Sequence, residues 1–202
     1  RDVLGSRGLG DVYKRQIQNN GIINHYEYII NSEGTIEIRH VLKPEGKMPL
    51  WFPRIGLTLT VSDALDQVKW YGRGPQENYP DRKTGYPTGI YASTVQAMYE
   101  PYLMPQDYGL RTDVRWLQLT TDKGIGLQFK MNEWFNFNIY PYSTDNLTKA
   151  MYTYQLQKQK GMTLNLDYAT TGVGCTARGV FGAYKAMPQE YRRTISIRPM
   201  MK

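Results

Sequence analysis

The sequence has little cysteine and little histidine, and it contains no long apolar segment. Cys175 is the one cysteine among 202 residues, which excludes an internal disulfide framework and leaves the compartment open. His25 and His40 lie in separate strand-like stretches without a cluster of ligand-type side chains, so we expect no metal and no other cofactor on this chain. No apolar run approaches the roughly 20 residues of a membrane-spanning helix, so we expect no membrane partner.

The net charge of +7 does not by itself indicate a nucleic-acid partner. Lysines and arginines are scattered among acidic residues, and local pairs such as Lys14–Arg15 and Arg192–Arg193 are short. A surface that follows a phosphate backbone needs basic side chains gathered in a stripe. We therefore expect no nucleic-acid binding.

The first sixteen residues differ from the rest of the chain. Residues 1–16 show no sustained strand or helix period, and three glycines interrupt them. They resemble a translated sequencing-adaptor tail. We therefore interpret residues 1–16 as a non-native tail that contributes nothing to the core, and residues 17–202 as the domain. Without a native start, cytoplasmic and periplasmic locations both stay open.

The aromatic composition is unusual, with 17 tyrosines and 4 tryptophans against 5 phenylalanines. Tyrosine and tryptophan favour β-strands, and they combine an apolar ring with a polar tip. Such rings suit cross-strand packing, and they also suit contact with sugars. We expect most of them to serve packing.

Alternating β-branched and apolar residues predict a series of strands from residue 17 onward. Residues 22–30 and 35–42 have the pattern of a hairpin around residues 31–34. Further strands are expected at residues 55–61, 68–71, 114–120, 125–131, 135–140, 162–168 and 194–198. Residues 144–155 alone have a helical pattern, with Thr144 or Asp145 as the N-cap. Regular strands without a linker predict one all-β domain, a sandwich of antiparallel strands.

A Gly- and Pro-rich segment at residues 72–87 follows the predicted strand that contains Trp70. We expect Trp70 to enter the core, because it ends an apolar strand. Gly72 and Gly74 are expected to adopt backbone angles that other residues avoid. Charges in a compact loop rarely stay unpaired, so Arg82 is expected to pair with Glu77 or Asp81.

A second long segment, residues 98–111, carries three tyrosines: Tyr99, Tyr102 and Tyr108. Polar aromatic residues in loops beside a sandwich suit a carbohydrate-binding face. Packing over an open sheet edge explains them equally well. The sequence leaves both interpretations open.

Several of these segments resemble one known family. The run Trp70–Arg82, WYGRGPQENYPDR, resembles the W-x-G-x-G-P-x-E-N-Y-x-D-R segment of the small-chain domain of glycoside hydrolase family 2 β-galactosidases. Shorter motifs of the same domain are matched by residues 52–56 (FPRIG), 99–102 (YEPY), 105–111 (PQDYGLR), 135–138 (FNFN), 142–143 (YS), 164–167 (LNLD) and 172–174 (GVG). Together the matches span roughly residues 17 to 198.

The resemblance implies a galactose-mutarotase-like super-sandwich, placed last in a five-domain enzyme. Such enzymes hydrolyse terminal β-D-galactosides with retention, using two glutamates of a central barrel domain. Magnesium and sodium also bind through barrel residues. On this chain the resemblance therefore implies no catalytic residue. It implies that the domain packs on its own barrel, meets the β-galactoside substrate through the parent enzyme, and belongs to a homo-oligomer.

The loop at residues 172–184 is where the resemblance places a contact with sugar. In relatives this loop carries a tryptophan that reaches the barrel, whereas residues 175–179 of this chain end in glycine at that position. We expect Arg178 to donate hydrogen bonds to sugar hydroxyls, and Phe181 or Tyr184 to present a ring face. Four glycines in the loop also fit a purely structural role in tight turns.

Two other interpretations stay open. The chain could be a free-standing carbohydrate-binding or aldose-1-epimerase-like module, or a scaffold that only stabilises a large oligomer. An epimerase needs a carboxylate base with histidine acids, and the two strand histidines lack an evident acidic partner. The gene sequence upstream of Gln16 distinguishes these interpretations, because a barrel with two catalytic glutamates would identify a domain of the enzyme.

Overall fold

The computed structural model describes residues 9–17, 20–174 and 179–201. In chain order the described elements are β1 (Leu9–Ile17), β2 (Asn20–Ile30), β3 (Ile36–Glu45), β4 (Arg54–Val61), β5 (Gln67–Arg73), β6 (Thr88–Thr94), β7 (Arg111–Thr120), β8 (Gly126–Tyr140), α1 (Thr144–Lys149), η1 (Thr153–Gln155), β9 (Met162–Thr170), η2 (Gly182–Tyr184) and β10 (Tyr191–Met200). The predicted all-β class is confirmed.

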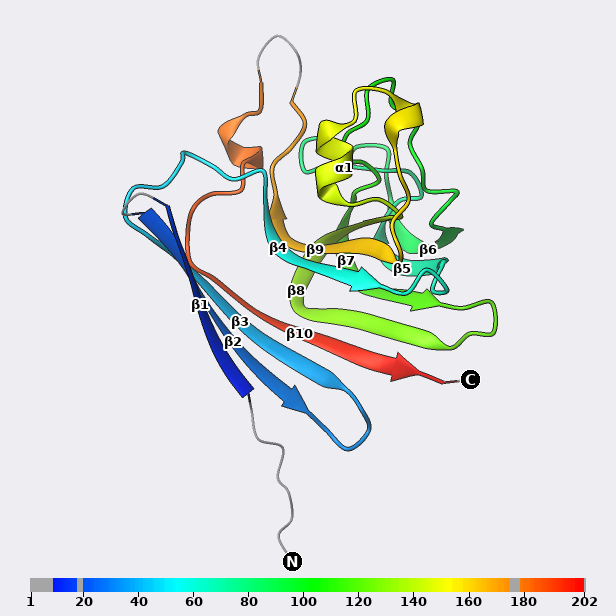
Figure 1. Ribbon diagram of the computed structural model, residues 1–202, viewed down its shortest axis with the longest axis horizontal. Helices are drawn as coiled ribbons and strands as arrows, with labels where there is room; N and C mark the ends of the chain where they lie inside the picture. Colours follow the sequence, from blue (N-terminus) through cyan, green and yellow to red (C-terminus); the bar gives the residue numbers. More distant parts are fainter. Residues whose placement is uncertain (1–8, 18–19, 175–178, 202) are drawn as a thin grey trace, which may run out of the picture.

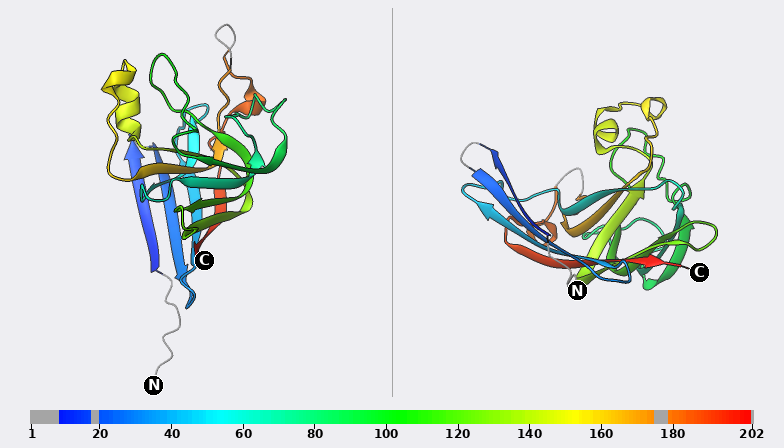
Figure 2. Two further views of the ribbon diagram at one scale, coloured as in Figure 1. Left: turned by 90° about the vertical axis from the view of Figure 1, so that its right-hand side faces the viewer. Right: turned by 60° about the horizontal axis from the view of Figure 1, so that its bottom comes forward.

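The strands form a long sheet and a shorter second layer. The long sheet has the order β1-β2-β3-β10-β8-β7-β5-β6, while β4 pairs with β9 and β9 pairs with β8. All of these pairs are antiparallel. Strands β1, β2, β3 and β10 extend together away from the remaining strands, and β4 and β9 cross over β8 (Figure 1). The left view of Figure 2 shows α1, η2 and several long loops at one end of the molecule, away from the β2–β3 hairpin.

Strand β8 belongs to both layers because a bulge bends it. Lys130 in its first half lies opposite Ser196 of β10 and Trp116 of β7. In its second half, Phe137 lies opposite Leu166 of β9. Between these halves the pairing with β7 jumps, so residues 131–134 have no direct partner there. Bulges bend strands and increase their twist, and strands that change layers form the corners of sandwiches. The two strands predicted at residues 125–131 and 135–140 are therefore one.

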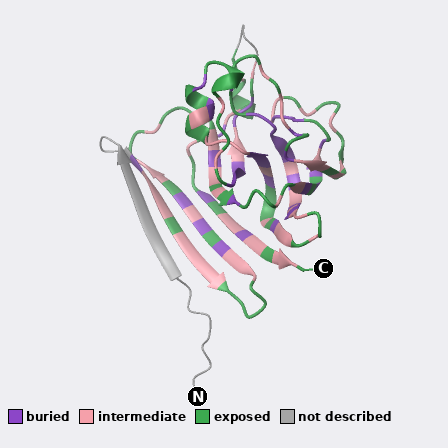
Figure 3. Ribbon diagram, turned by 45° about the vertical axis from the view of Figure 1, so that its right-hand side comes forward, coloured by how far each residue is buried: buried purple, intermediate pink, exposed green. Residues whose placement is uncertain are grey.

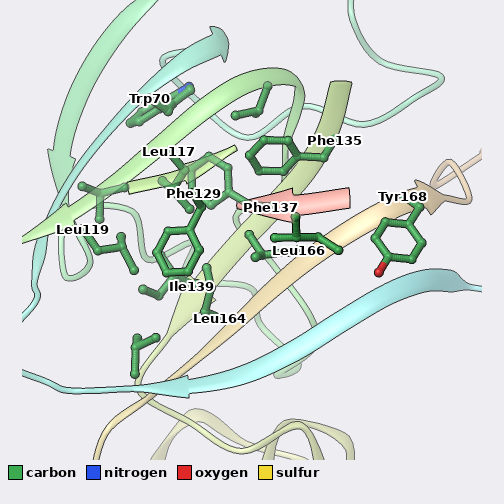
Figure 4. Packing of buried hydrophobic residues seen from close by; sticks show 14 of the residues in the cluster. Trp70, Leu117, Leu119, Phe129, Phe135, Phe137, Ile139, Leu164, Leu166 and Tyr168 are labelled. Atoms are coloured by element: carbon green, nitrogen blue, oxygen red, sulfur yellow. The ribbon is translucent and has the colours of Figure 1, made fainter. Parts of the chain in front are cut away.

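The hydrophobic core fills the space between the long sheet and strands β4 and β9. Figure 4 shows large side chains from β5, β7, β8 and β9 meeting there, among them Trp70, Phe137 and Leu166. Trp70 is fully buried, as predicted, and its Nε1 donates a hydrogen bond to the carbonyl oxygen of Arg73 at 3.0 Å. Buried residues alternate with more exposed ones along β3 (Figure 3), as expected of a strand with one face on the core.

The predicted hairpin is confirmed as strands β2 and β3. Asn31 closes its turn, because its side-chain oxygen accepts the N–H groups of Glu33 at 3.0 Å and Thr35 at 2.9 Å. Gly34 adopts a φ of 78°, which glycine tolerates without steric cost. The residues of the turn therefore favour the same hairpin that the alternating residues on either side predict.

We expected no strand before residue 17, and this expectation is wrong. Leu9–Ile17 forms β1 and pairs with β2 from Leu9 opposite Tyr28 to Ile17 opposite Asn20. An open sheet edge offers unpaired backbone groups that accept a chain whatever its side-chain period. Whether residues 1–16 are native stays a prediction, and residues 1–8 lie outside the described residues.

The helix at residues 144–155 is shorter than predicted and has another N-cap. Ser143 Oγ accepts the N–H of Asn146 at 3.0 Å, so Ser143 caps α1 instead of Thr144 or Asp145. Gln155 ends the helix early, because its side-chain oxygen accepts the N–H of Met151 at 2.7 Å. Side chains of this kind compete with the helical hydrogen-bond ladder.

Candidate functional site

Three loops meet at the end of β4 and β9 that carries Arg54 and Thr170: residues 72–87, residues 98–111 and the segment that joins β9 to β10. The last of these rises above the sheet at the top of Figure 1. We name residues 172–184 the sugar loop, after the function that the sequence predicts for it.

Asp81 fixes the base of the sugar loop. Its Oδ1 accepts the N–H of Val173 at 3.1 Å, and its Oδ2 accepts the N–H of Gly174 at 2.6 Å. A Cβ atom at Gly172 would lie 2.4 Å from the Asp81 carboxyl carbon, so this approach requires glycine. The hydrogen bonds to a carboxylate are of the strong kind. Asp81 therefore holds the loop.

A second set of bonds closes the loop from the other side. Gly172 donates its N–H to the carbonyl oxygen of Tyr184 at 2.8 Å. Thr171 Oγ1 donates to the carbonyl oxygen of Phe52 at 2.6 Å and accepts the N–H of Ala186 at 2.9 Å. Both ends of the sugar loop are thus tied to the sandwich at its base.

The described site residues of the sugar loop point outward from this fixed base. Phe181 is 64% exposed and Tyr184 is 40% exposed. They share one turn, in which Tyr184 donates its N–H to the carbonyl oxygen of Phe181 at 3.0 Å. Arg178, the third predicted sugar ligand, lies outside the described residues. The structure brings two of the three predicted ligands together.

Glu77 joins the other two loops. Its Oε1 accepts the hydroxyl of Tyr102 and Arg82 Nη2, the latter at 3.0 Å. Its Oε2 accepts the hydroxyl of Tyr79 at 3.1 Å and the N–H of Gly109 at 2.9 Å. Burial alone would raise the pKa of Glu77, but these four donors outweigh it and hold the pKa below its usual range. The predicted pairing of Arg82 is confirmed with Glu77.

Asp113 is a second carboxylate that holds residues 72–87 in place. It accepts Arg73 Nε and Lys83 Nζ, each at 2.6 Å. Burial opposes its ionised form, and the two cations outweigh this effect, so the pKa of Asp113 is lowered. Asp113 also adopts a φ of 55°, an uncommon conformation for a residue with a side chain. Its role is to fix the loop from the side of β7.

A polar ladder runs beneath the loops across β8, β9 and β4. Arg54 donates Nε and Nη2 to Asp167 Oδ2 at 3.1 and 2.8 Å, and Nη2 also to Asn138 Oδ1 at 3.2 Å. Asn165 donates to Asn138 at 2.9 Å and accepts from Thr58 at 2.8 Å. Burial raises the pKa of Asp167 to about 6, although Arg54 opposes the shift. The FPRIG, FNFN and LNLD motifs therefore meet in one buried network.

The expectation for Gly72 and Gly74 is wrong, because neither has a positive φ. Glycine is required there for space. A Cβ atom at Gly72 would lie 2.8 Å from Val114, and one at Gly74 would lie 2.8 Å from Tyr91 and 3.0 Å from Trp70. Both glycines let the loop pass close to core side chains.

No described residues form a group of three or more His, Cys, Asp or Glu that could hold a metal ion. That the magnesium and sodium implied by the resemblance bind to a barrel domain stays a prediction. None of the described helices is long and apolar enough to cross a membrane.

The sandwich and its motifs, together with the sugar loop held by Asp81, are those of a known class of protein domain. The chain matches the family described as "Beta galactosidase small chain" over residues 9–197, and it is a member of that family. It corresponds to a domain of β-galactosidase, which agrees with the resemblance seen in its motifs.

Individual relatives are much longer than the chain. It is 38% identical over 147 residues to the β-galactosidase of Priestia megaterium, covering 73% of the chain and 14% of that relative. It is 39% identical over 122 residues to the β-galactosidase of Vibrio cholerae, covering 60% of the chain and 11% of that relative. The solved structure of an aldose epimerase homologue from C. elegans aligns with a TM-score of 0.45 at 12% identity, over 95% of this chain and 68% of that one.

Sequence reasoning missed the clamp made by Asp81. The acid was considered as a partner for the adjacent Arg82, whereas its true partners lie 92 and 93 positions further along the chain. Gly172 was the available signal, because a glycine between a strand and a loop often marks close approach of another segment.

Proposed function

We propose that this domain serves a β-galactosidase that hydrolyses terminal non-reducing β-D-galactosides, and that it completes the sugar pocket of a neighbouring barrel domain. The observation that supports this proposal is the sugar loop, with a base clamped by Asp81 and with Phe181 and Tyr184 exposed. Exposed aromatic rings on a rigid base can stack on a sugar with little loss of conformational entropy on binding. Lactose is a substrate of this type.

The proposal assigns no hydrolysis to the isolated chain. Retaining hydrolysis needs two carboxyl groups about 5 Å apart that flank the scissile bond. Two carboxylates at this end of the sandwich are engaged in structural bonds: Glu77 accepts four donors, and Asp167 is buried beneath the loops against Arg54. The barrel of the parent enzyme supplies the catalytic pair in this proposal, and packing against it is the domain's second role.

The epimerase-like alternative has less support. His40 is 1% exposed, and both of its ring nitrogens face protein partners: Tyr168 Oη lies 2.7 Å from Nδ1, and Asn24 Oδ1 lies 3.0 Å from Nε2. A histidine enclosed in this way has no direct access to a substrate. Its role is structural, because its bonds join β3 to β2 through Asn24 and to β9 through Tyr168.

The test replaces Phe181 and Tyr184 with alanine, singly and together, in the parent enzyme. We expect the double variant to raise KM about tenfold, equivalent to about 1.4 kcal/mol of lost binding, and to reduce galactosyl transfer to glucose. Tyr154→Ala, an exposed tyrosine outside the sugar loop, is the matched control. Unchanged kinetics in the double variant, with unfolding unchanged, would show that the loop does not contact sugar.

A further inference from the structure

Several aromatic side chains lie on the outer face of the long sheet, the face that is turned away from the core. Side chains alternate between the two faces of a strand, so the neighbour of a core residue points outward. Figure 4 shows Trp70 of β5 and Leu117 of β7 among the core side chains. Their chain neighbours Tyr71 and Trp116 therefore point outward, and they lie opposite each other in the pairing of β5 with β7.

Arg115 joins these aromatic rings into one cluster. It lies at the bulge of β7, and its guanidinium carbon is 3.9 Å from the ring centroid of Trp134 and 5.1 Å from that of Tyr71. The rings of Tyr71 and Trp116 are 6.4 Å apart. Trp134 is 60% exposed and Tyr71 is 37% exposed, so large apolar rings stay open to water. We name Tyr71, Arg115, Trp116 and Trp134 the aromatic patch.

The strands around the aromatic patch present basic and uncharged side chains on the same face. Lys69, Lys130 and Arg198 are exposed, and none of them forms an ion pair with an acid in the described part of the chain. From β6 to β10 the two outward rows contain no acidic residue: they read Ile90–Tyr71–Trp116–Lys130–Ser196 and Ala92–Lys69–Gln118–Gln128–Arg198. The first row reaches an acid at Glu37 of β3, which already accepts Arg39 Nε at 2.9 Å.

The composition of this face favours a protein partner. Tryptophan, tyrosine and arginine are enriched at the centres of protein–protein interfaces, and polar residues surround them at the rim. Small-molecule sites are concave, whereas this is the broad face of a sheet. The rings of Tyr71 and Trp116 are also tilted by 53° to each other, so they do not form one flat surface on which consecutive sugar rings could stack.

The charge of the face selects the kind of protein. A second copy would place like charges opposite each other, which costs several kcal/mol, and each copy already has a net charge of +7. An acidic surface instead gives Lys69, Lys130 and Arg198 the partners that they lack. The β-galactosidases that the chain resembles are several times longer, so other parts of one polypeptide can supply that surface.

We propose that the aromatic patch and the cations around it dock on an acidic surface of another domain of the parent enzyme. This inference rests on the proposed function, because it takes the chain as one domain of a β-galactosidase. It concerns a second contact, since the sugar loop follows β9 in the other layer, whereas the patch belongs to β5, β7 and β8. Docking removes the Trp134 ring from water and places carboxylates beside the cations.

The first test compares the rates at which Lys69 and Lys130 are acetylated in the parent enzyme and in the 202-residue chain, followed by mass spectrometry of their peptides. We expect both lysines to react about tenfold more slowly in the parent enzyme, because the contact shields them until it opens. Salt at about 1 M reduces the Debye length to about 3 Å and should remove much of this difference. Equal rates in the two proteins would overturn the proposal, and protection that salt leaves unchanged would exclude the acidic surface.

Cross-linking identifies the surface that covers the patch. A water-soluble carbodiimide joins an amine to a carboxylate in direct contact, so Lys69 or Lys130 should be joined to Asp or Glu of another domain of the parent enzyme. Cross-links to acids within residues 17–202 of another subunit would identify a second copy and overturn the proposal. Protection that appears in the isolated chain as its concentration rises would do the same.

Charge reversal makes the result specific. In the parent enzyme, Lys69→Glu combined with Lys130→Glu should raise the oxidation of Trp134 by hydroxyl radicals to the level of the 202-residue chain. Lys123→Glu, at an exposed position in the turn between β7 and β8, is the matched control and should leave that oxidation unchanged. Reactive lysines in a parent enzyme that hydrolyses β-galactosides would overturn this inference alone. Protected lysines in a parent enzyme without that activity would contradict the proposed function and leave the docking surface in place.

Discussion

Replacing Glu77 with glutamine should destabilise the domain by about 3 kcal/mol. The carboxylate accepts four donors, two on each oxygen, from Tyr79, Arg82, Tyr102 and Gly109. Glutamine keeps one accepting oxygen and places an N–H₂ group against two of the donors. Each lost bond to a charged group costs about 1.5–3 kcal/mol, and the partial exposure of Arg82 places the sum for two bonds at the lower end.

Equilibrium unfolding in urea at pH 7 measures this effect. Glu33→Gln in the exposed turn between β2 and β3 is the matched control, and its effect should stay within about 0.5 kcal/mol. Because the folded-state pKa of Glu77 is lowered, its contribution is present above its unfolded pKa and is lost as the pH falls through the folded value. The variant should therefore lose less stability in acid. A Glu77→Gln protein within 1 kcal/mol of the wild type would refute this account of the loops.

Three further predictions concern stability. Burial lowers the pKa of His40 to about 4, so the unfolded chain, with an ordinary value near 6.5, takes up the proton first. Unfolding free energy should then fall by up to about 3 kcal/mol between pH 6.5 and 4, and by less in His40→Gln; equal slopes would contradict this. Trp70→Ala should cost about 3–5 kcal/mol in urea unfolding, and a cost below 1 kcal/mol would place its ring outside the core. Gly172→Ala should cost about 1–3 kcal/mol, because its Cβ atom would meet Asp81, and less in an Asp81→Ala background; additive effects in this cycle would exclude the contact.

The alternation of apolar and polar residues predicted the strands that have one buried face. It did not predict strands that form only because a neighbouring strand offers backbone partners. Strand β3 alternates because one of its faces packs on the core, and its position was predicted. Strand β6 was not predicted, because Gly89, Ala92 and Ser93 give it no apolar period. It forms because β5 offers a partner over seven residue pairs. Neither the backbone pairing of β6 nor that of β1 leaves a clear signal in side-chain type.

In the candidate site, contacts between residues close in sequence were predicted, and contacts between distant segments were not. The bond from Arg82 to Glu77 joins residues five positions apart in one loop, and it was predicted from the composition of that loop. The clamp from Asp81 to Gly174 joins residues 93 positions apart, so it depends on the whole topology. The position of Tyr108 also depends on topology, and the tyrosines of residues 98–111 had suggested either sugar contact or packing. In the structure Tyr108 packs in a small second core with Tyr140 and Leu147.

The motif run from Trp70 to Arg82 identifies the family because it is structural. Trp70 fills the core, Glu77 gathers four donors, and Asn78 accepts the N–H of Thr112 at 3.0 Å. Asp81 then carries this rigidity to the sugar loop. Few of these side chains can change without loss of several bonds, whereas the exposed tip of the sugar loop has no such constraint in its described part. A substitution at Phe181 can therefore alter the proposed contact with sugar while the base of the loop keeps its position. This separation explains how the domain keeps a recognisable family motif and yet has a glycine where the resemblance places a tryptophan.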